Sequence, residues 1–298
     1  MDFVYIGIIL FIAVVIACIV VYFKKEEDNE SVNNSLAKKM ERDEFSGKKI
    51  LYIGNSYGDD TIKYVREIAQ SLSIKNLVIA NLFMGGSSLQ NHFENAQNNK
   101  KEYEYRKNEN GEWTNKIGYS LKDGLDDEKW DLIVLQQQSS LNAFWSSFDP
   151  HLSLLKSYIK KVCPTALLAF NMTWAYPQNS QNPQFSKFDF DSEKMYERIC
   201  SVASTRIDND FDFYCVIPTG TAIQNAKELM GESLYRDDIH LNEKGRFLAS
   251  LCFVKEVFNP DLFDLAYAPD CVDRDTADNF ILAVNSAYEN PFFVSAVN

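Results

Sequence analysis

From Lys48 onward the sequence alternates between short apolar runs and segments whose apolar residues recur every three or four positions. The runs are KKILYIGNS, NLVIANLF, WDLIVLQQQ, ALLAFNMTW and FDFYCVIPT. After the first run, Ile62, Val65 and Ile68 have the spacing of an amphipathic helix. Parallel strands require crossover helices and are buried on both faces. The alternation therefore predicts an α/β domain over residues 48–298, with three layers (α/β/α) around a five-stranded parallel sheet.

A polar, aromatic-rich segment interrupts the alternation before the third apolar run. It reads EYEYRKNENGEWTNKIGYS, in which two arms flank Asn-Gly-Glu. Such a pattern is typical of two strands joined by a tight turn. We therefore expect a hairpin on the surface at about residues 100–120, inserted into the α/β domain.

The amino terminus differs in composition from the rest of the chain. Phe3 to Phe23 is a run of 21 residues without a charge, and a helix of this length spans about 30 Å, the thickness of a bilayer core. A cleaved signal peptide is the alternative, but Asp2 and the lack of a basic residue before the run do not fit one. We expect a transmembrane anchor over residues 1–23 and a polar tether over residues 24–47.

Charge and cysteine content argue against two kinds of binding site. The net charge is −12 and no strong basic run occurs, whereas nucleic-acid binders cluster Lys and Arg against phosphates. The six cysteines include no CxxC pair and no zinc-type spacing. Cys200, Cys215 and Cys252 lie in apolar segments and are predicted to be small buried side chains.

Four candidate site residues stand at or just past the predicted ends of strands. They are Ser56, Gly86, Gln137 and Trp174. Ligands of parallel α/β sheets bind beyond the carboxyl ends of the strands, so these residues would meet along one rim. For Ser56 an alternative stays open, because a serine between a strand and a helix is often only a helix N-cap.

A serine nucleophile needs a base to take its proton and a third group to orient that base. The chain has three histidines. His92 falls inside a predicted helix and His151 at a helix start, and we expect both to be surface or capping residues. His240 lies in the turn-like segment RDDIHLN, three residues after Asp237, which could bend back to its Nδ1. His240 is therefore the candidate base.

Donors for a developing oxyanion could come from two places. In FMGGSSL, Gly85 and Gly86 form a turn just before a predicted helix, where their backbone N–H groups could bind an anion. A tight turn that requires positive φ also explains the two glycines. In VLQQQSSLN, amide side chains directly follow a buried strand, where polar groups need partners. The candidates are Gln136, Gln137, Gln138 and Asn142.

Gly54-Asn55-Ser56, Gly85-Gly86, an amide-rich turn and Asp237-x-x-His240 occur in this order on the βα pattern. This combination resembles the SGNH (GDSL-type) hydrolase superfamily over about residues 48–260. With its GNS, LQQQSS, MTWAY and RDxxHLN blocks, the chain is most similar to a bacterial branch known mainly as a domain of unknown function. The resemblance implies a flavodoxin-like SGNH hydrolase fold and ester hydrolysis through an acyl-enzyme, without a metal or organic cofactor.

The resemblance also implies a role for each matching position. Ser56 would be the nucleophile, His240 the general base and then the acid, and Asp237 the group that orients it. Gly86 and Ser56 would each supply a backbone N–H to the oxyanion hole. The superfamily's third donor is an asparagine in a Gly-x-Asn-Asp block, which this chain lacks. A glutamine has to substitute, and we expect Gln137 rather than Gln138.

The expected substrate is a small-molecule or glycan ester, with carbohydrate O-acetyl esters first by analogy with the fold. Asn55, Gln138 and Trp174 are the candidate substrate-binding residues. Aromatic side chains on the rim could stack on a sugar or pack within the protein, and these are Phe144, Trp145, Trp174 and Tyr176.

Two other functions stay open. The missing Gly-x-Asn-Asp block would suit a non-catalytic carbohydrate-binding or scaffold protein with the same fold. A phosphate-binding α/β protein would want Lys or Arg near Gly85-Gly86, and MGGSSLQNH contains neither.

The side of the membrane is argued both ways. Lys24 and Lys25 follow the apolar run, so the positive-inside rule favours a cytoplasmic domain. A sugar esterase would work outside the cell.

Overall fold

The computed structural model describes residues 46–295, without the side chains of residues 229, 231 and 232. The predicted anchor, and the predicted tether up to residue 45, lie outside this range. No helix within the described range is long and apolar enough to cross a membrane. The anchor and its orientation therefore stay predictions from the sequence.

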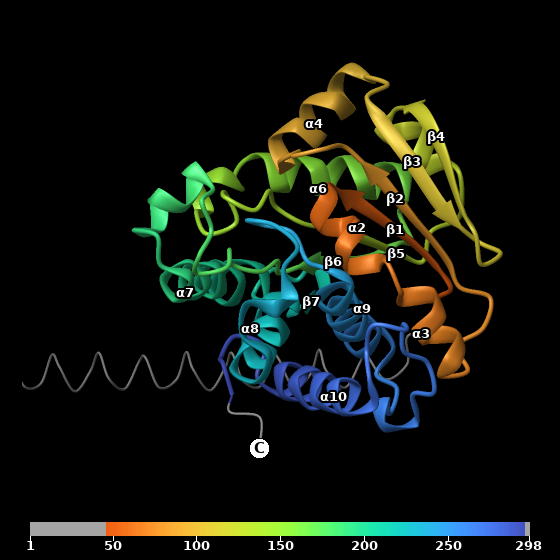
Figure 1. Ribbon diagram of the computed structural model, residues 1–298. Helices are drawn as coiled ribbons and strands as arrows, with labels where there is room; N and C mark the ends of the chain where they lie inside the picture. Colours follow the sequence, from red (N-terminus) through yellow and green to blue (C-terminus); the bar gives the residue numbers. More distant parts are fainter. Residues whose placement is uncertain (1–45, 296–298) are drawn as a thin grey trace, which may run out of the picture. The chain divides into compact units, whose positions relative to one another are not determined.

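Residues 46–295 contain a seven-stranded sheet in the order β4-β3-β2-β1-β5-β6-β7 (Figure 1). The strands are β1 (Lys49–Gly54), β2 (Val78–Phe83), β3 (Tyr103–Asn108), β4 (Trp113–Tyr119), β5 (Leu132–Leu135), β6 (Leu167–Asn171) and β7 (Phe213–Ile217). The strands β2, β1, β5, β6 and β7 are parallel. Numbered among themselves they stand in the order 2-1-3-4-5, which is that of flavodoxin-like folds.

The prediction of a purely parallel five-stranded sheet is wrong. The segment at residues 103–119 forms β3 and β4, and β3 pairs antiparallel with β2. The outer edge of β2 would otherwise present a row of unpaired backbone N–H and C=O groups, which an added hairpin satisfies. The hairpin thus extends the sheet and makes it mixed.

Alternation along the central strand divides the interior into two cores. Ile50 and Tyr52 of β1 pack into one hydrophobic cluster. Leu51 and Ile53 pack into the other, because successive strand side chains point to opposite faces. The cysteines predicted to be buried, Cys200, Cys215 and Cys252, are buried.

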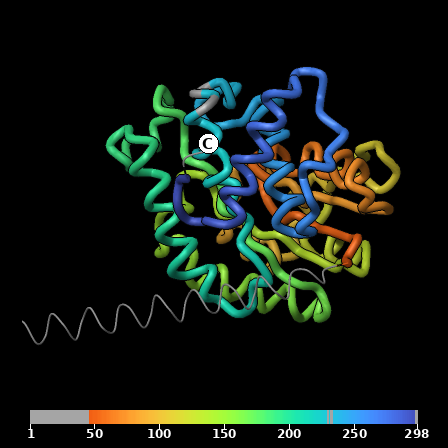
Figure 2. The backbone as a smooth tube through the Cα atoms, turned by 90° about the horizontal axis from the view of Figure 1, so that it is seen from below, coloured from red at the N-terminus to blue at the C-terminus, as the bar shows by residue number. Residues whose placement is uncertain are grey.

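Helices cover both faces of the sheet. The first core is closed by α2 (Ser56–Ile62), α3 (Val65–Ser71), α8 (Thr219–Met230), α9 (Glu243–Phe258) and α10 (Arg274–Glu289). The second is closed by α4 (Leu89–Asn98), α5 (Leu121–Asp126), α6 (His151–Val162) and α7 (Ser192–Val202). Seen from below, the carboxyl-terminal helices, in blue, lie over the face of the sheet that forms the first core (Figure 2).

Short helical turns complete the chain. They are η1 (Trp145–Ser147), η2 (Pro183–Phe188), the π-helix η3 (Ala203–Ile207), η4 (Gly231–Leu234) and η5 (Leu262–Asp264). In the sheet, β1 and β5 are neighbours; the chain passes from β1 to β2 on one side of this pair and from β5 to β6 on the other side. In such sheets ligands usually bind in the crevice between the two neighbouring strands from which the chain departs in opposite directions. Ser56 and the glutamine run follow these two strands.

Candidate active site

Ser56 is the first residue of α2, directly beyond the buried end of β1. The N-cap of this helix is Asn55, whose Oδ1 accepts a hydrogen bond from the Tyr57 N–H at 3.0 Å. Ser56 therefore does not cap the helix with its hydroxyl. Its Oγ lies 2.8 Å from the Nε2 of His240, which is 184 residues away in the chain.

Asp237 holds the other side of the His240 ring. Its Oδ2 lies 2.9 Å from His240 Nδ1, and its Oδ1 accepts the backbone N–H groups of Ile239 at 2.9 Å and His240 at 2.7 Å. Burial alone would raise the pKa of Asp237, but these N–H groups and the imidazole outweigh it and hold the pKa below its usual range. An ionised Asp237 favours the tautomer with the proton on Nδ1, which leaves Nε2 as an acceptor facing Ser56.

The loop that carries His240 is anchored to α2 by a buried carboxylate that sequence reasoning missed. Asp60 is fully buried and accepts hydrogen bonds from Arg236 Nη1 at 2.9 Å and Arg246 Nε at 2.8 Å. It also accepts the Leu241 N–H at 3.0 Å. Arg236 and Leu241 directly flank the segment from Asp237 to His240. Asp60 therefore ties both ends of that segment to the helix that begins with Ser56.

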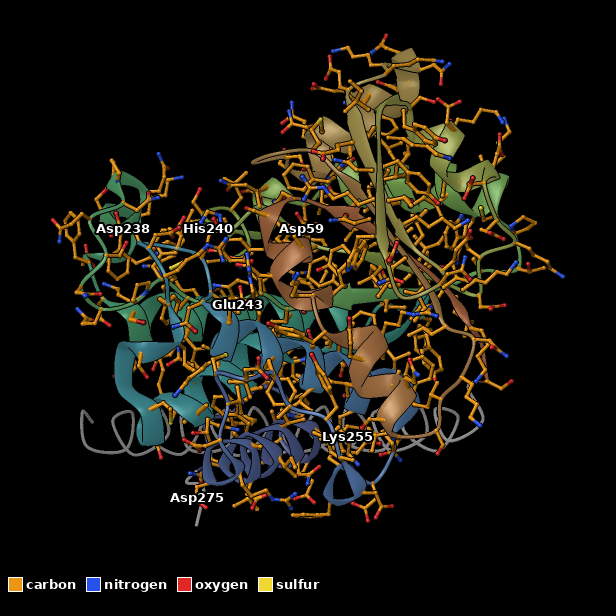
Figure 3. The ribbon with its side chains drawn as sticks, turned by 45° about the vertical axis from the view of Figure 1, so that its right-hand side comes forward. Asp59, Asp238, His240, Glu243, Lys255 and Asp275 are labelled. Carbon is orange, nitrogen blue, oxygen red and sulfur yellow. The ribbon has the colours of Figure 1, made fainter. Side chains whose placement is uncertain are left out.

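Figure 3 shows His240 and Asp238 on this loop, beside the helix that carries Asp59. The carboxylate that contacts the imidazole is that of Asp237, whereas Asp238 Oδ1 accepts the Gln181 N–H at 3.0 Å. It connects the His240 loop to the long loop before α7.

Gln137 does not reach the site, contrary to expectation. It is fully buried, and its Nε2 donates to Ser147 O at 2.8 Å and Ser147 Oγ at 3.1 Å. Its Oε1 accepts the N–H groups of Leu89 at 3.1 Å and Gln138 at 2.8 Å. The amide of Gln137 thus joins the start of α4 to η1 and has no proton left for an oxyanion.

Gln138 follows Gln137 in this run, and its side-chain amide is bonded through the oxygen. Its Oε1 accepts the Ser140 N–H at 3.0 Å and the Ser140 hydroxyl at 2.9 Å. Because a backbone N–H must face the oxygen, the orientation of the amide is determined. Among the described residues Gln138 Nε2 has no partner, and the side chain is partly exposed.

Gly86 stands in a turn at the end of β2, on the other side of β1. The turn is closed by a hydrogen bond from the Ser87 N–H to Met84 O at 3.2 Å. Gly86 has φ +65°, a value that its missing Cβ permits. In the described part of the chain its N–H has no hydrogen-bond partner, and Gly86 is exposed. Since β2, β1 and β5 are neighbours, Gly86, Ser56 and Gln138 all follow adjacent carboxyl ends.

Asn55 connects these segments instead of facing a substrate. It is buried, and its Nδ2 donates to Ser87 O at 2.9 Å. Its Oδ1 accepts from Gln136 Nε2 at 2.6 Å as well as from Tyr57. Both ends of the Asn55 amide thus join the ends of β1, β2 and β5, in place of the substrate contact that the sequence predicted.

Trp174 is also not available to a substrate. It is fully buried, donates through Nε1 to Ile239 O at 3.0 Å, and stacks on Tyr57 with ring centroids 4.2 Å apart. Trp174 therefore holds the His240 loop through the carbonyl of the residue that precedes His240. Of the other aromatic candidates, Tyr176 is buried, and Phe144 and Trp145 pack on Phe188 and Phe148.

The sequence and the fold resemble those of known proteins. The model of a domain of unknown function, DUF4886, matches residues 49–290. The chain belongs to the DUF4886 family. A crystal structure of a DUF4886 family protein from Bacteroides uniformis is 31% identical, covers 84% of this chain and 97% of that chain, and has a TM-score of 0.79. No curated protein matches the sequence.

Two more distant structures are similar over most of their length. A protein described as a GDSL-like lipase from Parabacteroides merdae is 12% identical, covers 70% of this chain and 94% of that chain, and has a TM-score of 0.46. A catalytic mutant of an acetylxylan esterase from Geobacillus stearothermophilus is 12% identical, covers 74% and 95%, and has a TM-score of 0.44. Membership of a family of unknown function agrees with the expected bacterial branch, while its place in the SGNH superfamily stays a prediction.

His92 is neither a surface nor a capping residue in this DUF4886 protein. It is buried, with Nε2 3.0 Å from Ser87 Oγ and Nδ1 2.8 Å from Tyr103 OH. Its position three residues after Leu89 and four before Ala96, on the apolar face of α4, was the signal that could have revealed its burial. His151 is partly exposed at the start of α6, where no side chain caps the helix.

Acid should destabilise the protein through His92. Burial lowers the pKa of His92 to about 3, whereas the unfolded chain binds this proton near pH 6.5. Between these two values only the unfolded state is protonated, so the free energy of unfolding should fall by about 2 kcal/mol from pH 7 to pH 5 through this group. Above about pH 6.5 the group contributes no pH dependence.

Urea unfolding of the wild type and His92→Gln at pH 7 and pH 5 measures this contribution. The variant, which cannot titrate at this position, should lose about 2 kcal/mol less between the two pH values. An equal loss in both proteins would contradict the prediction.

Within residues 46–295, no group of three or more His, Cys, Asp or Glu side chains could hold a metal ion.

Proposed function

We propose that this DUF4886 protein is a serine ester hydrolase of the SGNH type that works through an acyl-enzyme. The observation that carries the proposal is the hydrogen-bonded series of Ser56, His240 and Asp237, with successive distances of 2.8 and 2.9 Å. These side chains come from two segments far apart in the sequence. A serine, a base and an orienting carboxylate in this geometry form a nucleophilic triad.

The chemistry follows from the hydrogen bonds. As Ser56 Oγ attacks the ester carbonyl, its proton passes to His240 Nε2, and Asp237 stabilises the resulting imidazolium. Collapse of the tetrahedral intermediate breaks the bond to the alcohol, which takes the proton from His240. A water molecule then attacks the acyl-enzyme with His240 again as base. The carboxylic acid leaves and Ser56 recovers its proton.

Three donors would stabilise the oxyanion. Two are the backbone N–H groups of Gly86 and of Ser56, the latter at the first position of α2, where no intrahelical acceptor exists. The third is Gln138 Nε2, which replaces the asparagine of the superfamily block. The support for Gln138 is that Ser140 fixes its amide orientation while the nitrogen has no partner among the described residues.

The substrate class is proposed by analogy with the superfamily alone, as small acyl esters with O-acetylated carbohydrates first. The alternative hypothesis, a non-catalytic carbohydrate-binding protein, predicts that the side chains of Ser56, His240 and Asp237 do not lie within hydrogen-bond distance of one another. The 2.8 Å distance between Ser56 Oγ and His240 Nε2 argues against it.

The direct test uses the full-length chain with p-nitrophenyl acetate, butyrate and octanoate. Turnover of the acetate ester, together with covalent capture of Ser56 by a phosphonate ester that reacts with activated serines, is the expected result. Mass spectrometry of the peptide that contains Ser56 locates the adduct. No turnover of any ester and no adduct would overturn the proposal.

Replacing Gln138 with alanine should lower kcat by about 10², the usual effect of removing one oxyanion donor. KM for p-nitrophenyl acetate should change little, because the hydrogen bond is strongest in the transition state. Gln90→Ala is the matched control, since the Gln90 side chain bonds to Glu94 on the exposed face of α4. If Gln138→Ala keeps the wild-type kcat, Gln138 is not the third donor.

A further inference from the structure

The β3–β4 hairpin reaches the candidate active site through a chain of buried side chains. Tyr103, at the start of β3, lies with its OH 2.8 Å from His92 Nδ1. His92 Nε2 lies 3.0 Å from Ser87 Oγ, and this oxygen is 3.4 Å from Gly54 O. All three side chains are at least nine-tenths buried. No step of ester hydrolysis uses them, so their arrangement needs another explanation.

The direction of these hydrogen bonds can be assigned. A neutral imidazole has one N–H and one acceptor nitrogen. If Tyr103 donates its O–H to Nδ1, the His92 N–H lies on Nε2 and donates to Ser87 Oγ. The Ser87 hydroxyl then donates to Gly54 O. In this arrangement each polar atom of the Tyr103, His92 and Ser87 side chains has a partner. In the reverse direction the Tyr103 hydroxyl proton would have no acceptor among the described residues.

Ser87 is the residue through which this chain acts on the oxyanion turn. Its N–H closes the turn by donating to Met84 O at 3.2 Å, and its carbonyl accepts from Asn55 Nδ2 at 2.9 Å. Its hydroxyl is held by His92. Gly86, with the free N–H, precedes it directly. The position of the Gly86 N–H therefore depends on the hydrogen bonds that fix Ser87.

A second contact links the hairpin to the helix of the nucleophile. Arg106 of β3 forms an ion pair with Asp59 of α2, and Asn81 Nδ2 donates to the same carboxylate at 2.6 Å. The Arg106 guanidinium also lies 3.8 Å from the centroid of the Phe83 ring, at the end of β2. The hairpin thus contacts both segments that would surround a bound ester carbonyl.

We propose that the β3–β4 hairpin is a positioning element of the active site. Tyr103 acts through His92 and Ser87 to hold the Met84–Ser87 turn and its Gly86 N–H in place, and Arg106 holds α2. Tyr103, His92 and Arg106 are positioning residues that do not touch the substrate. This inference rests on the proposed esterase function for its effect on catalysis, but not for its effect on the turn.

The test compares Tyr103→Phe with Tyr105→Phe in the full-length protein. Tyr105 lies on the same strand, is equally buried, and donates its OH to Asp127 Oδ2 at 2.8 Å, away from the turn. Both changes remove the one hydrogen bond of a buried tyrosine hydroxyl and keep the ring. The measurements are kcat and KM for p-nitrophenyl acetate and the hydrogen-exchange rate of the Ser87 amide.

Tyr103→Phe should lower kcat about three- to tenfold with KM within about twofold, because small displacements of a catalytic donor slow the reaction without weakening ground-state binding. It should also raise the exchange rate of the Ser87 amide by about tenfold, since the turn opens more often. Tyr105→Phe should leave the kcat, the KM and this exchange rate at wild-type values, even if both variants lose similar thermal stability.

A wild-type kcat or a wild-type exchange rate in Tyr103→Phe would overturn the inference when the parent protein is active. If the parent protein hydrolyses no ester, the proposed function fails, and the exchange measurement alone decides the inference. Faster exchange in Tyr103→Phe but not in Tyr105→Phe would then support the control of the turn by the hairpin, and equal exchange would overturn it.

Discussion

Ser56→Ala is expected to lower kcat for p-nitrophenyl acetate by at least about 10⁴ and to leave the thermal stability unchanged. The large loss follows because alanine removes the nucleophile itself. The small effect on stability follows because Asn55, not Ser56, caps α2. In the described structure the Ser56 hydroxyl bonds to His240 alone. Steady-state kinetics and a thermal unfolding curve measure both quantities.

A serine that caps a helix should show the opposite behaviour. Ser120 caps α5 in a capping box with Asp123, far along the chain from the triad. Ser120→Ala should lower the free energy of unfolding by about 1 kcal/mol and keep the wild-type kcat. If Ser56→Ala instead behaves like Ser120→Ala, the triad is not catalytic.

Residues that act as one unit are not additive, which gives a sharper form of the test. His240→Ala should fall to about the same residual rate as Ser56→Ala, and the double variant should fall no further. A further loss in the double variant would mean that the two side chains act independently.

Asp60→Ala is expected to lower the free energy of unfolding by about 3 kcal/mol, near the low end of the cost of breaking a buried ion pair. The low end applies because the side chains of Arg236 and Arg246 are 34% and 23% exposed and keep some contact with solvent. The change also leaves the Leu241 N–H without its acceptor. Because Asp60 anchors the segment from Asp237 to His240, kcat should fall by about 10². Urea unfolding and steady-state kinetics provide the two measurements.

Asp131→Ala is the matched control for Asp60. Its Oδ2 accepts the backbone N–H groups of Lys48 at 2.7 Å and Lys49 at 2.9 Å, at the opposite end of β1 from Ser56. The variant should lose stability and keep kcat. Equal losses of kcat in Asp60→Ala and Asp131→Ala would show that Asp60 stabilises the fold without positioning the triad.

The α/β fold and the triad candidates could be predicted from the sequence because both depend on local or repeated signals. The apolar runs with helical segments between them require parallel strands with crossovers. Ser56, Asp237 and His240 are predictable because few histidines compete for the role of base and because Asp237 lies only three residues before His240. The structure places these three side chains within hydrogen-bond distance.

The glutamine run at residues 136–138 shows what local sequence signals do not predict. Successive side chains in an extended segment point to opposite sides. Gln136 bonds to Asn55 and Tyr52, whereas Gln137 bonds to Ser147. Which of the neighbouring amides keeps a free N–H depends on the partners that other segments bring to each side. The sequence pattern QQQ contains no such information.

The sequence by itself determined the alternation of strands and helices, the burial of the parallel strands on both faces and the residue types needed for a nucleophilic triad. Only the tertiary structure decided that the hairpin joins the sheet, that Asn55 and Trp174 support the site from within, and that His92 and Asp60 are buried. The physical reason is that periodicity reports which side of its own element a residue faces. Hydrogen-bond partners of buried polar groups come from distant segments, and only the packed fold brings those segments together.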